Sequence, residues 1–87
     1  METRIAVISI IVEDRNSVEK LNGILHEYGR YIIGRFGLPY RERGIHIICA
    51  VMEAPQDQIS AMSGKIGRLK GVNAKATYSN IKTTTEE

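Results

Sequence analysis

A short polar turn is the part of this sequence in which residue types and spacing best suit ligand chemistry. Asp14, Arg15, Asn16 and Ser17 lie between an apolar run and a stretch whose apolar residues recur at helical spacing. A helix that begins here exposes unpaired amide groups, which bind anions. A carboxylate such as Asp14 accepts hydrogen bonds from an amine, and the planar guanidinium group of Arg15 pairs with a carboxylate. These four residues form the first part of the predicted ligand-binding site.

Gly34 and Gly37 form the second part of that site. Both glycines lie in the apolar stretch at residues 31–38, where the missing side chains let a ligand come close to the backbone. We expect this stretch of a neighbouring subunit to meet the polar turn. In the alternative interpretation the turn is only a helix cap, with Asn16 at the N-cap position and Glu19 three residues later in a capping box.

The sequence contains no catalytic constellation, and we predict no catalytic residue, no metal site and no cofactor. His46 and Cys49 come nearest to a metal-binding pair, but they are three residues apart in an expected strand. An odd separation directs the two side chains to opposite faces of the sheet. We therefore expect Cys49 to be a small buried residue and His46 to pack or hydrogen-bond at an interface. A metal site completed by a partner chain is the alternative.

Length and composition restrict the class of protein. The 87 residues, 43% of them hydrophobic and 25% charged, indicate one ordinary globular domain. The net charge of +2 predicts neither nucleic-acid nor membrane binding, and RNA binding by the arginines around the expected hairpin is a minor alternative. The single cysteine cannot form an intrachain disulfide, and the apolar run at residues 5–12 is too short to cross a bilayer. We expect a cytoplasmic domain without a leader peptide.

The first half of the chain predicts a strand, a helix and a second strand. Residues 4–13 are apolar on both alternating faces, as in a central strand. Residues 17–28 have helical spacing, and Gly29 is the expected left-handed stop. A strand weakened by glycines follows at residues 31–38 and is expected to end before Pro39, which suits the edge of a sheet.

The second half repeats this order after a hairpin connection at residues 41–44. Residues 45–52 are again apolar on both faces and predict a second central strand. Pro55 is expected in the first turn of a second helix, and Gly71 is expected to end it. Residues 72–79 alternate between apolar and polar side chains, which is typical of a half-buried strand.

The element order β-α-β-β-α-β predicts an α+β, ferredoxin-like fold with an antiparallel sheet and two helices on one of its faces. Right-handed crossovers place the first and third strands in the centre. We expect a single domain at residues 1–82 and a flexible tail at residues 83–87. Because both central strands are also apolar on the uncovered side, the sheet is expected to pack against another copy of the chain in a homodimer or homotetramer.

The polar turn resembles the start of ACT domains, which are small ligand-sensing modules with the pattern strand, Asp-Arg-Pro-Gly-Val, helix. Asp14, Arg15 and Val18 match this pattern, whereas Asn16 and Ser17 replace the Pro-Gly pair. The resemblance implies an ACT-like fold of the ligand-sensing kind.

Over residues 3–82 the sequence resembles the iron-only hydrogenase system regulator family. The segment Gly-Arg-Phe-Gly-Leu-Pro at residues 34–39 is the most specific part, and residues 5–14 and 46–51 also contribute. The family is ACT-like and similar to the C-terminal domain of the nickel-responsive repressor. The repressor's His-x-His pair with a following Cys is not reproduced between His46 and Cys49, so nickel sensing is not implied.

These observations predict a non-enzymatic, oligomeric, ligand-sensing regulatory domain, and the resemblance implies that an iron-only hydrogenase system is what it regulates. The alternative is a structural module that binds another protein through its sheet without a small-molecule ligand. Another copy of the chain is the expected partner, and a small-molecule effector and a further protein partner are left open. Direct nucleic-acid binding and membrane association are not expected.

Overall fold

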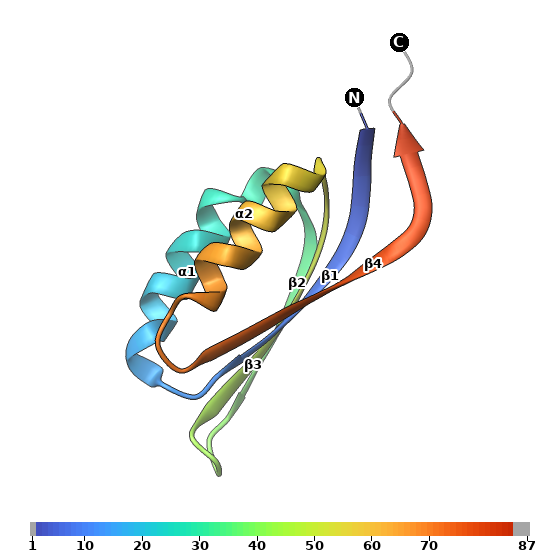
Figure 1. Ribbon diagram of the computed structural model, residues 1–87. Coiled ribbons are helices and arrows are strands. Elements are labelled where there is room, and N and C mark those ends of the chain that lie inside the picture. Colours follow the sequence, from blue (N-terminus) through green and yellow to red (C-terminus); the bar gives the residue numbers. More distant parts are fainter. Residues whose placement is uncertain (1, 85–87) are drawn as a thin grey trace.

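Six main elements make up the fold of residues 2–84, the part of the chain that the computed structural model describes. They follow one another as β1 (Glu2–Val12), α1 (Val18–Glu27), β2 (Ile32–Tyr40), β3 (Ile45–Ala54), α2 (Gln56–Gly67) and β4 (Val72–Thr84). Two single 3-10 turns, η1 (Arg15–Ser17) and η2 (Gly29–Tyr31), flank α1. The predicted β-α-β-β-α-β order is therefore confirmed (Figure 1).

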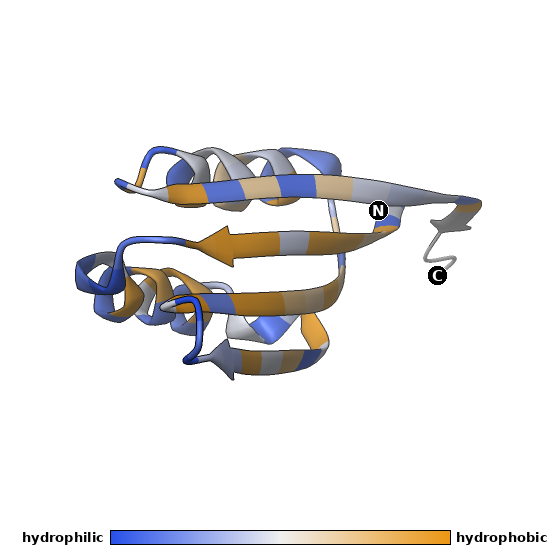
Figure 2. Cartoon of the chain, turned by 90° about the horizontal axis from the view of Figure 1, so that it is seen from below, coloured by the Kyte–Doolittle hydropathy of each residue, from blue (hydrophilic) through white to orange (hydrophobic). Residues whose placement is uncertain are grey.

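The four strands form one antiparallel sheet in the order β2-β3-β1-β4. Both helices lie against the same face of this sheet, and no other element of residues 2–84 covers the opposite face (Figure 1). β1 and β3 occupy the centre, as their two apolar faces predict, whereas β4 alternates between apolar and polar residues (Figure 2). An edge strand tolerates such alternation because only one of its faces meets the core.

The hydrophobic core lies between the sheet and the two helices. Ile8 and Ile10 of β1 and Met52 of β3 point from the sheet toward the helices and are fully buried. Leu21 and Leu25 face them from α1 at helical spacing. The α2 residues that close the core are Ile59, Met62 and Ile66. This one-sided core accounts for the fold's cohesion, since burying each such side chain contributes about 1.5–3 kcal/mol.

One predicted helix stop and one predicted strand boundary around β2 are wrong, although α1 ends within one residue of the expected position. α1 does not end at a left-handed Gly29, because Gly44 and Gly71 are the glycines with positive φ among the described residues. The chain instead continues from α1 into η2. β2 also does not end before Pro39, which pairs with His46 in the ladder. Proline is tolerated there because β2 is an edge strand, on which one row of amide groups has no ladder partner.

Three further boundaries differ in the second half of the chain. α2 ends at Gly67, with Arg68 as its C-cap, and not at Gly71 as predicted. Pro55 stands at the N-cap of α2 and not within its first turn, with φ −59° and ψ 150°. β4 continues to Thr84, which pairs with Glu2, so this strand includes the first two residues of the predicted tail. The rest of that predicted tail, residues 85–87, lies outside the described part of the chain.

Candidate ligand site

The polar turn between β1 and α1 is capped by a different residue from the one expected. The Asp14 carboxylate accepts a hydrogen bond from the Asn16 backbone amide at 2.9 Å and so caps η1. Asn16 is therefore not the cap. Ser17 holds the N-cap position of α1 without a side-chain capping bond, so the predicted capping box of Asn16 and Glu19 is also wrong. Aspartate wins here because its side chain bonds readily to the backbone amide two residues ahead.

The same turn is packed tightly against the loop that leads into β4. The buried Ser17 hydroxyl donates a hydrogen bond to the Lys70 carbonyl at 2.6 Å. The Glu13 amide donates to the Gly71 carbonyl at 2.7 Å. A Cβ atom on Gly71 would lie only 2.6 Å from the Asp14 Cβ, so only glycine fits this close approach. Asp14 and Ser17 thus both have structural partners in the folded chain.

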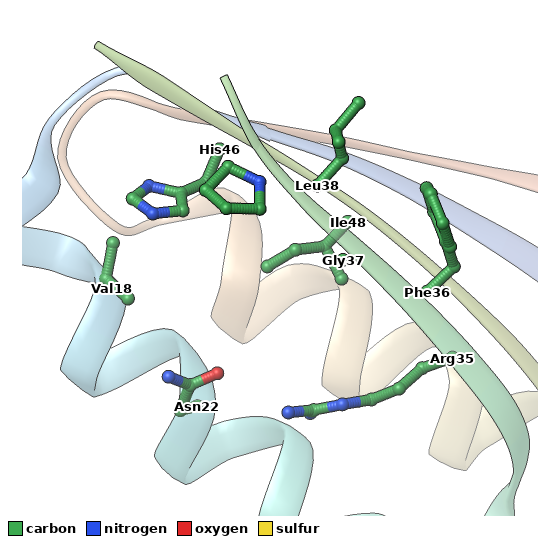
Figure 3. Close-up of a pocket in the computed structure, with 9 residues that line it drawn as sticks. Val18, Asn22, Arg35, Phe36, Gly37, Leu38, His46 and Ile48 are labelled. Carbon is green, nitrogen blue, oxygen red and sulfur yellow. The ribbon is translucent and has the colours of Figure 1, made fainter. Parts of the chain in front are cut away.

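A cavity of about 300 Å³ opens between α1 and the β2–β3 hairpin (Figure 3). Asn22 faces it from α1, and Arg35 extends from β2 toward that helix. Phe36 and Leu38 border the cavity but point away from it, to the other side of the strand (Figure 3). The remaining wall is mainly apolar and consists of Val18, Gly37, Pro39, His46 and Ile48.

A second cavity of about 360 Å³ adjoins the first at the end of the hairpin. Arg15 of the polar turn and Arg41 of the hairpin line it, together with Gly44 and Ile45. Pro39 and His46 line both cavities, which therefore adjoin each other at these two residues. We call the two cavities together the hairpin groove. It runs from Arg35 beside α1 to Arg15 and Arg41 at the hairpin end.

The hairpin groove is positively charged. Arg15, Arg35 and Arg41 line it, whereas none of its lining residues is an aspartate or a glutamate. None of these three arginines forms an ion pair with another residue of the 2–84 range. Their guanidinium groups, which carry five donors each, are available to an anion from solvent.

His46 is the unusual polar group of the groove. Its Nδ1 atom is buried and has no hydrogen-bond partner among the described residues. Buried polar side-chain atoms in folded proteins nearly always have a partner. The unmatched nitrogen therefore marks a place where the folded chain leaves hydrogen-bonding capacity unused beside a cavity.

The structure brings together only part of the predicted ligand site. Arg15 and Gly37 both line the hairpin groove, and they do so within one chain. Gly34 pairs with Val51 on the uncovered face of the sheet and does not line the groove. Asp14, Asn16 and Ser17 do not line the groove either.

Sequence reasoning missed Arg35, Asn22 and His46 as groove residues. The signal for Arg35 was its position two residues before Gly37, since alternate residues of a strand share a face. Asn22 carried no comparable signal, because an exposed polar residue on a helix is ordinary. His46 was expected to pack or hydrogen-bond at an interface, which stays a prediction; within the single chain it lines both cavities of the groove.

The uncovered face of the sheet carries exposed apolar side chains. Phe36 is 61% exposed, Leu38 45%, and Tyr40 and Ile11 41% each. Phe36 pairs with Cys49, so both lie on this face, while His46 lies on the helix-covered one. The prediction that His46 and Cys49 point to opposite faces is therefore confirmed. The prediction that Cys49 is buried is wrong, because its side chain is only half-buried on the face that no helix covers. We call this surface the open face.

Neither a metal cluster nor a membrane span is found in the part of the chain that the structure describes. Three or more His, Cys, Asp or Glu side chains do not come together there in an arrangement that could hold a metal ion. No helix between residues 2 and 84 has the length and apolar character needed to cross a bilayer.

The fold defines the class of protein: a small α+β module with a ferredoxin-like, ACT-like fold. Residues 4–76 match the model of the TM1266-like family, described as "Iron-only hydrogenase system regulator, putative". The chain belongs to this family.

Two solved structures show how far the similarity extends. The uncharacterized protein TM1266 from Thermotoga maritima is 36% identical, with a TM-score of 0.83 over 87% of this chain and 96% of that one. A formyltetrahydrofolate deformylase from Pseudomonas putida KT2440 is 12% identical, with a TM-score of 0.64. It matches 88% of this chain but only 29% of its own length, so it shares the fold alone. Among curated proteins none matches this chain.

Proposed function

We propose that this chain is a non-enzymatic regulatory module that binds a small ligand in the hairpin groove and self-associates through the open face. One observation carries the proposal: a single strand, β2, serves both surfaces. Arg35, Gly37 and Pro39 line the groove, whereas the alternate residues Phe36 and Leu38 point to the open face. A ligand that moves β2 from the groove side therefore also moves the side chains of β2 on the open face.

β2 is also the strand that is easiest to move. None of its nine residues is buried, and its sole strand neighbour is β3. Strands with few buried contacts have low local stability and shift at small free-energy cost. A ligand that binds one arrangement of β2 better than another shifts the population toward the arrangement it prefers. Groove binding and self-association are then thermodynamically coupled, and each strengthens or weakens the other by the same factor.

The open face supports self-association for a physical reason. Soluble monomers rarely expose a large continuous apolar patch. Fully burying a side chain such as Phe36 or Leu38 contributes about 1.5–3 kcal/mol. Two copies that meet symmetrically bury each of these residues twice, which suits a closed homodimer or a homotetramer.

Light scattering coupled to size exclusion tests the self-association. Wild-type protein at micromolar concentration is expected to exceed 9.7 kDa, the mass of one chain. Leu38→Asp places a charge on the open face and is expected to give a folded monomer. Ala61→Asp is the matched control, because it places the same charge at an exposed position of α2, away from the open face. A wild-type monomer at all accessible concentrations would contradict this part of the proposal.

The regulatory role is proposed from the family, whose description names an iron-only hydrogenase system. Disrupting the gene is expected to change hydrogenase abundance or hydrogen evolution in cells that carry both genes, and wild-type protein is expected to restore it. Complementation with Leu38→Asp and Arg35→Gln then separates two functions. If Leu38→Asp fails while Arg35→Gln fully restores the phenotype, the chain is an interaction module that needs no ligand.

A further inference from the structure

We propose that the hairpin groove binds a small organic phosphate with a flat apolar body, about the size of a nucleoside monophosphate. The inference deepens the proposed function, and rests on it, by naming the class of ligand. The phosphate is placed between Arg15 and Arg41, and the body lies in the cavity beside α1. Three features of the groove lead to this assignment: its charge, its walls and the unpaired His46 nitrogen.

The charge of the groove matches a phosphate better than a carboxylate. Arg15 and Arg41 line one cavity and Arg35 the other, without an acidic lining residue in either. A carboxylate neutralises one positive charge, whereas a phosphate monoester carries about −1.5 to −2 charges at neutral pH. Guanidinium groups also bind phosphate oxygens through two parallel hydrogen bonds. A dianion therefore neutralises both arginines at the hairpin end, whereas a carboxylate neutralises only one.

The walls beside α1 suit a flat, mainly apolar group. Val18, Pro39 and Ile48 supply apolar surface, and Asn22 offers one amide that both donates and accepts hydrogen bonds. Gly37 lines the same cavity, and a Cβ atom built there meets no protein atom within 4 Å. A planar group can therefore lie against the backbone at Gly37. Small-molecule sites commonly combine apolar walls with a few such polar groups in a volume of this order.

His46 lies where the two halves of such a ligand would join. Its ring borders both cavities, and its buried Nδ1 atom has no partner in the folded chain. A ligand oxygen near the link between body and phosphate supplies the hydrogen-bond partner that this nitrogen lacks. His46 thus acts as a positioning residue that favours a ligand long enough to span both cavities.

Isothermal titration calorimetry and thermal shift with three probes test this assignment. The probes are adenosine monophosphate for the whole ligand, adenosine for the body and inorganic phosphate for the head. Adenosine monophosphate is expected to bind saturably and to raise the melting temperature. Each fragment is expected to bind at least tenfold more weakly than the whole probe, because it fills only one cavity.

Variants locate the binding site. Arg41→Gln and Arg15→Gln are each expected to lower the affinity for adenosine monophosphate about tenfold or more, since each removes a charge-assisted hydrogen bond. Arg43→Gln is the matched control, because this hairpin arginine lines neither cavity. Gly37→Val is expected to block the adenosine-bearing probe without harming the fold, as its side chain enters open space in the groove. Gly34→Val is its control on the opposite face of β2.

The outcomes separate this inference from the proposed function. The inference is overturned if the Arg15, Arg41 and Gly37 variants bind adenosine monophosphate like wild type. It is also overturned if the whole probe binds no better than phosphate, or if no probe binds. In each of these cases the regulatory proposal survives if Arg35→Gln still fails to complement the disrupted gene, because that result demands a groove ligand of another class.

Discussion

On the helix-covered face of the sheet Ile8 is completely buried, whereas on the open face Phe36 is 61% exposed. The same strands supply both faces, and their apolar residues simply alternate from one to the other. The apolar side chains of the covered face stabilise the fold, because the two helices remove them from water. The open face keeps its apolar surface available for another chain. The difference shows that alternate residues of the same strands can be fully buried in the core or exposed on the surface, and it is the exposed set that the proposed self-association uses.

A charge on each face gives the largest contrast between them. Ile8→Lys places a cation at a fully buried core position without a partner and is expected to prevent folding. An unpaired buried charge costs about 3–5 kcal/mol, comparable to the total stability of many small domains. Far-ultraviolet circular dichroism measures the loss of structure.

The matched variant for Ile8→Lys is Ile11→Lys, three residues further along β1 on the open face. It is expected to keep the wild-type spectrum and to lose self-association, because its charge stays in water. If both variants unfold, the open face contributes to the fold of the single chain, and the division between the faces is wrong.

Truncation of a side chain gives a smaller contrast of the same kind. Met62→Ala leaves a cavity beneath α2 in the core and is expected to cost about 2–5 kcal/mol of unfolding free energy. Phe36→Ala removes a larger side chain from the open face and is expected to change the stability of the monomer by about 0.5 kcal/mol or less. Urea denaturation at low protein concentration measures both values. Equal losses would contradict the comparison.

Two glycines with nearly equal φ angles test how tightly each layer is packed. Gly71, with φ +70°, lies against the polar turn in the helix-side layer, and Gly44, with φ +66°, lies at the exposed tip of the hairpin. Alanine costs about 1–2 kcal/mol at either site because the left-handed conformation disfavours a Cβ atom. Gly71→Ala is expected to cost more than Gly44→Ala, since its Cβ also meets Asp14 at 2.6 Å. Thermal unfolding of both variants checks this, and equal costs would show that the turn can move aside.

The ion pair on the outer surface of the helices is expected to have the smallest effect. The Lys65 ammonium lies 2.9 Å from the Glu27 carboxylate and so connects α2 to α1. Hydrogen bonds from Lys65 to Glu27 and then to Tyr28 raise the pKa of Lys65 above its ordinary value of 10.5. Because the folded pKa is the higher one, this stabilisation is complete below pH 10.5 and is lost as the pH rises through the raised pKa.

Lys65→Gln is therefore expected to lower the melting temperature slightly at neutral pH, since exposed pairs contribute little. The difference from wild type should shrink as the pH is raised beyond 10.5. Lys20→Gln, on the exposed side of α1, is the control. A difference that grows with pH would contradict the sign of the pKa shift.

The predicted fold is confirmed in its order, its sheet and its central strands, and the reason lies in particular residues. Ile5, Val7 and Ile11 of β1 are apolar on one face, and Ile8 and Ile10 on the other, so β1 could only be central. The errors lie at the ends of helices and strands, where a single hydrogen bond decides which residue is the last one. Nothing in the sequence favoured Asp14 over Asn16 as the cap. Nor did anything favour a 3-10 turn after α1 over a left-handed Gly29.

The candidate site was less predictable than the fold. Arg15 and Gly37 were identified from their own chemistry, and both line the groove. Arg35 and Arg41 belong to the hairpin and Asn22 belongs to α1, so their place in one groove depends on how α1 crosses the hairpin. The prediction also placed Gly34 in the same site as Gly37. The two glycines are three residues apart in a regularly paired part of β2, so they lie on opposite faces of the sheet.

The sequence by itself determined the element order, the strands at the centre of the sheet and the family, because hydrophobic periodicity and motif residues are local properties of the chain. The tertiary structure alone decided which arginines meet in one groove and which face of β2 each residue occupies. Those features depend on packing angles and on register, and a register shift of one residue exchanges every side chain of a strand between its two faces.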